Sequence, residues 1–335
     1  MILPRAVLLD LVREAARAPS VHNVQPARWR FLDSGEVRLY RTVARALPAA
    51  DPTGRDVLQS LGAAFEGLAL ALTRREVGLS APVLVASNDG TAPDGHEEVA
   101  SARLVAGAER AELADYVLRR RSFRGRFDPA SAEELQTLRK RFADAPDARL
   151  IVDVDGIHDV ARRYDRASFG FLSQAPYLRE FFSWCRFHRS HPDWNRDGLN
   201  ADCLALSEVE RIAASFLLRP AVFQVLKRLG VARPAISEAA QIRSSSAILL
   251  YCPRADANPF DVGRRFYRLW LEVTAAGFSA CPLSAVADDR NEAASLERTQ
   301  GLASDRRILN VFRLGVVRRA SVPESPRIPA EELLV

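Results

Sequence analysis

The sequence predicts an α+β protein made of two related lobes. Runs with helical periodicity alternate with short strand-like runs along the 335 residues, and a hydrophobic content of 48% is enough to bury a substantial core. Short stretches of the first half also recur, in the same order, in the second half. We expect a first lobe over residues 1–115 and a second lobe over residues 116–335.

The first half is expected to begin with a helix over 8–18, which ends at Pro19 because the residue before a proline is disfavoured in helical conformation. A hairpin around Asp33-Ser34-Gly35 and a long amphipathic helix over 53–77 follow. The other elements expected here are strands at 29–32, 36–41, 83–87 and 99–106 and helices at 109–121 and 131–143.

The second half is expected to alternate between strands and helices. Strands are predicted at 150–154, 246–252, 280–286 and 307–316, and helical regions at 157–183, 203–229, 259–276 and 289–300. An aromatic and basic segment, about 177–235, is interpreted as a helical insertion that forms a lid. The proline-rich tail over 318–335 is expected to lie along the surface.

The recurring stretches predict an internal duplication. They pair Phe65-Glu66 with Leu271-Glu272, Gly78 to Pro82 with Gly277 to Pro282, and Arg103-Leu104 with Arg313-Leu314. The alternative is that any two amphipathic helices leading into strands look alike in an α+β protein. Three matches in one order favour the duplication, so the single chain would be equivalent to a fused pseudo-dimer.

The basic charge of the chain is concentrated in one place. The formal net charge is +5, and five arginines fall within eight residues, at Arg119, Arg120, Arg121, Arg124 and Arg126. A nucleic-acid binder usually carries a basic stripe interleaved with aromatic residues, whereas acidic and basic residues are otherwise mixed here. We expect a small anionic ligand and no nucleic-acid partner; the nucleic-acid alternative predicts affinity that falls steeply with salt.

The remaining composition argues against metal, disulfide and membrane functions. The four cysteines lie far apart without a C-x-x-C pair and are expected to be buried thiols. His188 and His191 have a metal-compatible spacing, but Pro192 breaks a helix and no acidic or cysteine ligand stands close, so no metal site is expected. No run approaches the roughly 20 apolar residues of a membrane span. The charged residues near the start do not fit a signal peptide, so we expect a cytoplasmic protein with no membrane partner.

The loop after the first helix carries a polar motif, Ala18-Pro19-Ser20-Val21-His22-Asn23-Val24-Gln25-Pro26. Prolines stiffen both ends, and Ser20, Asn23 and Gln25 offer hydroxyl and amide groups to a flat heterocycle. His22 is a candidate proton donor to a reduced substrate, because histidine titrates near neutrality. The alternatives are a helix-ending loop whose polar side chains cap its own backbone, and a structural role for His22.

A second motif, Arg120-Arg121-Ser122-Phe123-Arg124, predicts a phosphate clamp. In an extended chain Arg120, Ser122 and Arg124 point the same way, because side chains alternate with a period of two. Two guanidiniums and a hydroxyl on one face can bind phosphate oxygens through charge-assisted hydrogen bonds. The alternative is a solvated or helix-terminal arginine patch.

Together, the helix followed by APSxxNxQP and the RxSxR motif resemble the paired signatures of the nitroreductase superfamily. The resemblance implies FMN as cofactor, with the first motif beside the flavin ring and the second on its phosphate, and NADH or NADPH as reductant. It implies two nitroreductase-like lobes, each a mixed or antiparallel sheet flanked by helices. Ordinary members carry RxSxR first, so the inverted order resembles the duplicated single-chain branch, a monomeric pseudo-dimer or a weak homodimer.

The resemblance adds site residues in the second lobe. Pro282, Leu283 and Ser284 fall where the family presents backbone amides to the flavin ring, and Arg327 falls in a closing segment that often joins the phosphate clamp. The segment 174–177 lacks the serine and asparagine of a second ring wall, so one FMN per chain is implied. The cofactor-binding residues predicted are Pro19, Ser20, Val21, Asn23, Gln25, Arg120, Ser122, Arg124, Pro282, Leu283, Ser284 and Arg327.

The function implied by the resemblance is an FMN-dependent oxidoreductase that passes electrons from NADH or NADPH to a small flat acceptor, such as a nitroaromatic or a quinone. The sequence has no G-x-G-x-x-G loop, which argues against a separate Rossmann domain. One alternative is a protein that stores or sequesters FMN behind the 177–235 segment with little turnover. Another is a flavin enzyme that catalyses an oxidation or the breakdown of flavin.

Overall fold

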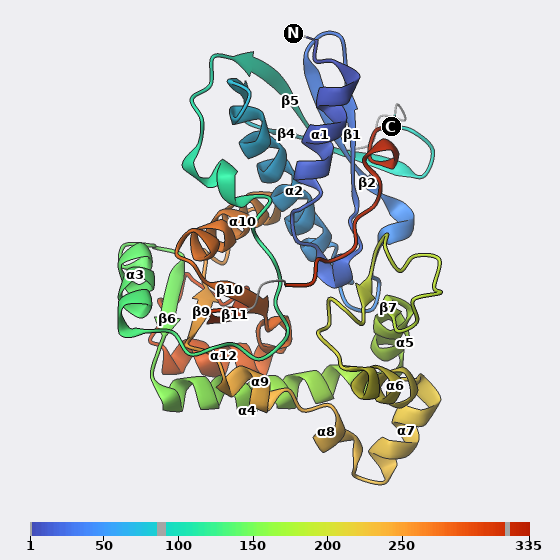
Figure 1. Cartoon of the computed structure of the whole chain (residues 1–335), viewed down its shortest axis with the longest axis vertical. Helices are drawn as coiled ribbons and strands as arrows, with labels where there is room; N and C mark the ends of the chain where they lie inside the picture. Colours follow the sequence, from blue (N-terminus) through green and yellow to red (C-terminus); the bar gives the residue numbers. More distant parts are fainter. Residues whose placement is uncertain (1, 86–91, 319–321) are drawn as a thin grey trace.

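The computed structural model describes residues 2–85, 92–318 and 322–335, which form two α+β lobes with a pair of packed helices between them (Figure 1). The first lobe holds two long helices, five strands and two short 3-10 turns. These elements are α1 Arg5–Ala15, η1 Val21–Asn23, β1 Ala27–Phe31, β2 Glu36–Thr42, η2 Val43–Arg45, α2 Arg55–Thr73, β3 Val77–Leu79, β4 Val83–Leu84 and β5 His96–Ala106.

The chain enters the second lobe after a further 3-10 turn, η3 Glu112–Tyr116. The first group of second-lobe elements is α3 Ala132–Phe142, β6 Ala148–Ile151, α4 Val154–Leu172, α5 Ala175–Ser183, β7 Cys185–Arg186, β8 Leu199–Asn200, α6 Glu208–Leu217, α7 Pro220–Arg228 and α8 Ala232–Ala235. The second group is α9 Ala239–Arg243, β9 Ala247–Tyr251, α10 Pro259–Ala275, β10 Ser279–Pro282, α11 Ser284–Asp288, α12 Arg290–Thr299, β11 Asn310–Gly315 and η4 Ala330–Glu332.

Each lobe is organised around one antiparallel sheet. The first sheet has the order β1-β2-β5-β3, with β4 also pairing with β5, and the second has the order β10-β11-β9-β6. Helices pack against both sheets, so the predicted α+β class with two helix-flanked antiparallel sheets is confirmed. The second sheet is the more deeply buried, because every residue of its central strand β9 is buried and apolar.

The helix α10 belongs to both hydrophobic cores. Its residues Phe260, Tyr267 and Leu271 pack into the first-lobe core, whereas Trp270 and Val273 pack into the second-lobe core. A helix with apolar residues on two faces must be covered on both sides. The two lobes therefore cannot separate without exposing one face of α10.

Two glycines allow α2 and α10 to pack at backbone contact. A Cβ at Gly62 would stand 1.9 Å from the Phe260 carbonyl oxygen, and a Cβ at Gly263 would stand 1.9 Å from the Gln59 carbonyl oxygen. The two contacts are reciprocal, since residues 62 and 263 lie 201 positions apart and so do residues 59 and 260. Such reciprocity is typical of two related elements that meet across a twofold axis.

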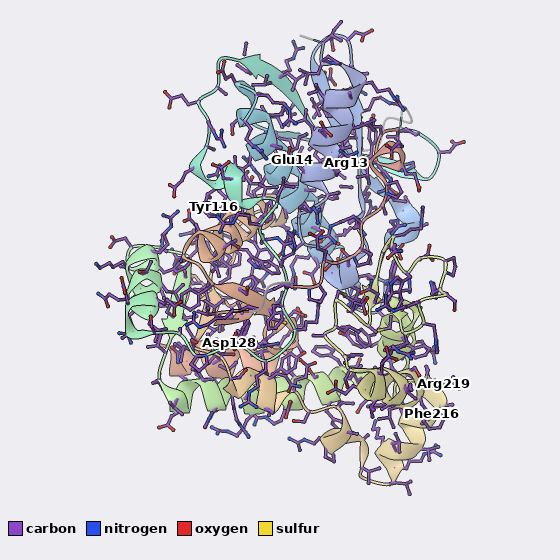
Figure 2. All side chains as sticks on the ribbon, viewed as in Figure 1. Arg13, Glu14, Tyr116, Asp128, Phe216 and Arg219 are labelled. Atoms are coloured by element: carbon purple, nitrogen blue, oxygen red, sulfur yellow. The ribbon has the colours of Figure 1, made fainter. Side chains whose placement is uncertain are left out.

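Part of the predicted secondary structure is wrong between the lobes. Only the short turn η3 forms within the helix predicted at 109–121, because Leu113 and Val117 are drawn into the first-lobe core and the chain then becomes extended. Tyr116, labelled in Figure 2, ends this turn, and the Arg119 guanidinium lies 5.1 Å from its ring centroid. Residues 86 and 87 of the strand predicted at 83–87 lie outside the described residues.

The strand predicted at 280–286 is also too long. β10 ends at Pro282, which cannot donate a hydrogen bond to a further ladder position, and α11 begins at Ser284. This early end turns the chain into a helix beside the junction of the lobes. It places α11, instead of a strand, next to the candidate site described below.

The prediction of a surface tail over 318–335 is wrong for its last part. The red segment that runs up beside β1 in Figure 1 buries Ile328, Ala330 and Leu333 in the first-lobe core. The Trp29 amide donates to the Leu333 carbonyl at 2.8 Å, and Trp29 forms a parallel bridge with Leu334. Apolar side chains at these positions outweigh the local proline content, so the tail ties the two lobes together.

The segment over 177–235 forms a small helical subdomain from α5 to α8, at the lower right of Figure 1. Its own core is limited to Leu178, Phe223 and Ala232. Phe216 and Arg219, labelled in Figure 2, lie on its outer side, and Phe216 is half exposed. Elsewhere in the fold, the four cysteines are buried with free thiols, as expected.

The described helices also bear on membrane and metal binding. None of them combines the length and the apolar character needed to cross a bilayer. Within residues 2–85, 92–318 and 322–335, no three histidine, cysteine, aspartate or glutamate side chains are grouped as metal ligands would be. Buried charge is instead handled by ion pairs: Glu14, labelled in Figure 2, accepts hydrogen bonds from Arg74 and Arg75 at the end of α2.

Candidate functional site

A cavity of about 300 Å³ lies at the junction of the two lobes, at the lower end of the size range of small-molecule sites. Its wall combines the loop after α1, the first half of α2, the extended segment after η3, and parts of α4, α5, α10, α11 and the tail. Ten of the twelve predicted cofactor-binding residues line it: Pro19, Ser20, Val21, Asn23, Arg120, Ser122, Arg124, Pro282, Ser284 and Arg327. Gln25 and Leu283 do not.

The segment 120–124 is extended because it runs beside the edge strand β10. Ser122 forms a parallel bridge with Ala280, and the Phe123 amide donates to the Ala280 carbonyl at 3.0 Å. In this conformation Arg120, Ser122 and Arg124 all face the cavity, as the alternation of side chains predicts. The extended conformation expected for the RxSxR motif is therefore present.

Arg120 brings an unpaired charge to the cavity. It is only 3% exposed, its Nη2 donates to the Arg17 carbonyl at 2.7 Å, and its guanidinium lies 4.4 Å from the Trp270 ring centroid. Its Nε and Nη1 have no hydrogen-bond partner among the described residues. Burial lowers the pKa of Arg120 to about 10, with a further contribution from Arg121. A buried cation without a counterion favours an anionic ligand.

Two more arginines stand at the same end of the cavity. The Arg327 Nη1 donates to Asn23 Oδ1 at 2.7 Å, while its Nε is buried without a partner among the described residues. Burial and the nearby Arg120 lower the pKa of Arg327 to about 9. Arg124 makes only a long contact, 3.4 Å, to the Cys203 carbonyl. None of the three forms an ion pair with a carboxylate in the described part of the chain.

Arg313 of β11 supports this end from behind. It is fully buried, and its guanidinium donates to the carbonyls of Arg124 at 2.6 Å and Gly125 at 3.0 Å. The same guanidinium lies 4.7 Å from the Phe127 ring centroid. Sequence reasoning assigned Arg313 only to the repeat; a single arginine inside the apolar run Val311-Phe-Arg-Leu-Gly was the available signal. It positions the backbone that carries the cavity arginines.

The loop after α1 is held in a conformation that few residues adopt. His22, Asn23 and Gln25 have φ values of 47°, 57° and 51°, in the left-handed region. The Asn23 side chain fixes the loop, because its Nδ2 donates to the carbonyls of Gly198 at 3.1 Å and Pro326 at 3.0 Å. Asn23 thus contacts the cavity while it joins the loop to the tail.

Gln25 is placed away from the cavity. Its Oε1 accepts a hydrogen bond from the Ile328 amide at 3.0 Å, and its Nε2 donates to the Arg196 carbonyl at 2.9 Å. Its backbone amide donates to Ser20 Oγ at 3.0 Å. The Gln25 side-chain amide is therefore occupied by backbone groups outside the loop. Ser20, in contrast, caps the loop's own backbone, as the alternative for this loop predicts.

His22 lines the cavity but is not set up as a cationic acid. Its ring contacts Phe181, with centroids 5.3 Å apart, and its Nε2 is buried without a hydrogen-bond partner among the described residues. Burial, assisted by Arg124, lowers the pKa of His22 from 6.5 to about 4. The imidazole is uncharged near neutral pH, which weakens the predicted role as proton donor.

The second-lobe segment 281–284 reaches the cavity only in part. Pro282 and Ser284 line it, whereas Leu283 is fully buried in the second-lobe core. The Leu283 amide is also used, since it donates to the Val311 carbonyl at 2.6 Å. Any backbone amide offered to a ligand here must therefore come from another residue of the turn.

The acidic residues Asp56, Glu238 and Asp288 of the cavity wall were missed by the sequence reasoning. Asp56 of α2 and Asp288 of α11 both line the cavity, next to Tyr177 of α5. Arg55 donates to both carboxylates, from Nε to Asp56 at 2.9 Å and from Nη2 to Asp288 at 3.3 Å. The available signal was the spacing of Ser284 and Asp288, which are four residues apart and share one face of a helix.

Comparisons with known proteins were made for the whole chain. No protein-family model matches it. It is 43% identical over 75 residues to an uncharacterized protein of Mycobacterium tuberculosis, a match that covers 22% of this chain and 20% of the relative. It is 40% identical over 58 residues to a protein of the same species named as a candidate NAD(P)H nitroreductase, covering 17% of each. The chain thus spans about a fifth of the length of these relatives.

Solved structures also resemble this chain only distantly. An FMN-bound nitroreductase from Bacteroides fragilis is 12% identical, with a TM-score of 0.36, and covers 65% of this chain and 95% of its own. A BluB-like flavoprotein from Clostridium difficile 630 is 14% identical, with a TM-score of 0.37, and covers 67% and 98%. Both TM-scores are low, so neither likeness establishes a shared fold. The 40% identical relative and the FMN-bound structure are both named as nitroreductases, the family that the two motifs resemble.

Proposed function

We propose that this chain binds one FMN at the lobe junction and works as an NAD(P)H-dependent oxidoreductase of the nitroreductase superfamily, in its duplicated single-chain form. The observation that carries the proposal is the group of three cavity arginines, Arg120, Arg124 and Arg327, which form no ion pair with a carboxylate in the described part of the chain. Arg120 and Arg327 are buried without a counterion, which is costly in a ligand-free protein and is relieved by a phosphate. Arg124 also interacts with the carboxyl of Glu238, which lines the same cavity.

The cavity residues fit FMN in chemical character. Arg120, Arg124, Arg327 and Ser122 would hold the phosphate, and Pro19 to Asn23 with Pro282 and Ser284 would border the ring. When bound, FMN supplies two-electron transfer between a nicotinamide and a second substrate. The protein's part is to position that ring, to exclude water from it and to supply protons. The acceptor we propose is a small flat molecule of the nitroaromatic or quinone type.

The reciprocal contact of α2 and α10 supports a fused pseudo-dimer with lobes 1–115 and 116–335. At the position equivalent to Ala63, 201 residues on, stands Arg264, whose Nε donates to the buried Glu66 at 2.8 Å. An ion pair there leaves no apolar wall for a second flavin ring. We therefore propose one FMN per chain, in a monomer that already contains both halves of the site.

A second candidate function is storage of FMN with little turnover. It is favoured by the 177–235 segment, because Tyr177, Phe181 and Leu204 from this segment line the cavity. A wall of this kind can cover a bound flavin. The same wall is also compatible with an enzyme, since many flavin sites exclude water during the reaction.

The test is the visible spectrum of the purified protein, before and after anaerobic NADH or NADPH. Flavin bands that bleach support the oxidoreductase. Bands that persist with both nicotinamides but bleach with dithionite support storage. A colourless protein that takes up no added FMN refutes both. Arg124→Ala should weaken FMN binding by a few kcal/mol through loss of a charge-assisted contact, while exposed Arg126→Ala should leave it unchanged.

A further inference from the structure

The charged side chains of the cavity form two groups. The first, here called the phosphate end, is Arg120, Arg124 and Arg327 together with Glu238, whose carboxyl interacts with Arg124. The second, here called the acidic end, is the pair Asp56 and Asp288, which shares Arg55. The charged groups that influence Asp288 are Asp56, Arg55 and Asp51, whereas those that influence Arg327 are Arg120 and Arg17. The two sets share no member, so the acidic end is separate from the phosphate end. One cavity therefore offers two chemically different binding regions.

The acidic end is built from both lobes. Arg55 bridges the two carboxylates, so one cation stands against two anions. The side chains of Asp56 and Asp288 keep 18% and 32% exposure, respectively, which leaves both accessible from the cavity. Tyr177 adds a phenol and Gln59 an amide to the same wall. Burial and the repulsion between the two carboxylates favour the protonated form, and Arg55 opposes this effect.

Asp288 is the better placed of the two acids for chemistry. It lies four residues after Ser284 in α11, so both side chains lie on one face of the helix, and both line the cavity. Burial, with Asp56 as the next cause, raises the pKa of Asp288 to about 7. The ionisable and charged groups that act on it are Asp51, Arg55, Asp56 and Tyr177.

We propose that the acidic end is the electron-acceptor subsite, that it selects neutral or cationic flat acceptors over anionic ones, and that Asp288 is the catalytic acid that protonates the acceptor. This inference rests on the proposed function. An anionic acceptor would meet two carboxylates and a single arginine, which disfavours its entry. A neutral quinone or nitroaromatic meets a protonated carboxyl that can donate to its oxygen.

The proton balance is simple for a quinone. When bound, FMN reduced by NADH or NADPH would supply the acceptor with two electrons and one hydrogen, the equivalent of a hydride. The resulting oxyanion takes its second hydrogen as a proton from the Asp288 carboxyl, and a hydroquinone leaves. Asp288 is then a carboxylate and regains its proton from water through the cavity mouth.

The experiment measures the two half-reactions separately in the FMN-loaded wild type, Asp288→Asn, Asp288→Glu and the exposed control Asp10→Asn. The flavin is reduced by NADPH, or by dithionite if neither nicotinamide reduces it, and is then mixed with a neutral quinone at several pH values. For Asp288→Asn we expect unchanged flavin content and unchanged reduction, but reoxidation by the quinone at least about tenfold slower. Asp288→Glu should restore part of the rate, and Asp10→Asn should match the wild type.

Two further readouts distinguish catalysis from a structural role. Wild-type reoxidation should slow as the pH rises through about 7, and Asp288→Asn should lack this dependence. A sulfonated quinone should react at least about tenfold more slowly than the neutral one with wild type, and the Asp56→Asn, Asp288→Asn double variant should narrow that gap. Equal rates and an unchanged pH profile in Asp288→Asn, with flavin bound, would overturn this inference and leave the proposed function standing. A chain that binds no flavin would remove both.

Discussion

Replacing Arg120 by methionine tests whether this arginine binds a ligand or supports the fold. Methionine keeps much of the length and the apolar stem but removes the charge. In the flavin-free protein the buried cation is costly, because burial lowers the pKa of Arg120 to about 10 from its ordinary 12.5. At roughly 1.4 kcal/mol per unit, that shift corresponds to about 3 kcal/mol, taken as an order of magnitude.

Two contacts offset this cost. The guanidinium lies 4.4 Å from the Trp270 ring centroid, a cation–π contact of about 1–2 kcal/mol. Its hydrogen bond to the Arg17 carbonyl contributes about 1 kcal/mol. The terms nearly cancel, so Arg120→Met should change the stability of the flavin-free protein by no more than about 1 kcal/mol. With FMN bound, the loss of a charge-assisted phosphate contact of about 3 kcal/mol should weaken binding about 100-fold.

The assay is thermal unfolding with and without a fixed excess of FMN, together with a direct titration of flavin fluorescence. Ligand stabilisation grows with the ratio of free ligand to Kd, so the variant should show a smaller FMN-dependent rise in Tm. Arg119→Met, next in the chain and exposed, is the matched control and should behave as the wild type. The reasoning is refuted if Arg120→Met costs about 3 kcal/mol or more without ligand and binds FMN with unchanged affinity.

Three other predictions test the parts of the fold that surround the cavity. Gly263→Ala should destabilise the protein by about 3 kcal/mol or more in denaturant unfolding, because the new Cβ would stand 1.9 Å from the Gln59 carbonyl oxygen. The control is Gly170→Ala in an exposed helical position, where a Cβ would meet no atom within 4 Å. This control should be neutral or stabilising by about 0.5–1 kcal/mol. Gln25→Ala should expose the C-terminal tail to limited proteolysis and lower the stability of the protein by about 1–3 kcal/mol. The FMN affinity of the intact chain should stay within about threefold of the wild type. A large loss of affinity with a tail still protected from proteolysis would show that Gln25 binds the ligand. Wild-type stability should fall as the pH drops from 6.5 towards 4, because His22 binds a proton in the unfolded chain but not in the folded protein. The total loss of stability is about 3 kcal/mol. The same dependence of stability on pH in His22→Phe would contradict the lowered pKa of His22.

The sequence predicted most of the secondary-structure elements and the common direction of the side chains in the segment 120–124. Helical spacing located α2 and α10, and alternation placed Arg120, Ser122 and Arg124 on one side of an extended segment. These features depend on side-chain direction within a few residues, which backbone geometry fixes locally. The polar loop after α1, which the sequence analysis singled out, also lines the cavity.

Only the tertiary structure decided which polar groups face the cavity. Gln25 carries the same side-chain amide group as Asn23. Its amide oxygen, however, accepts a hydrogen bond from the backbone of the tail, 303 residues away. Leu283 is turned into the core by the end of β10, and Asp288 enters the wall because α11 replaces the expected strand. Such choices depend on which distant backbone groups need partners and which apolar faces must be covered, and neither is encoded in local spacing.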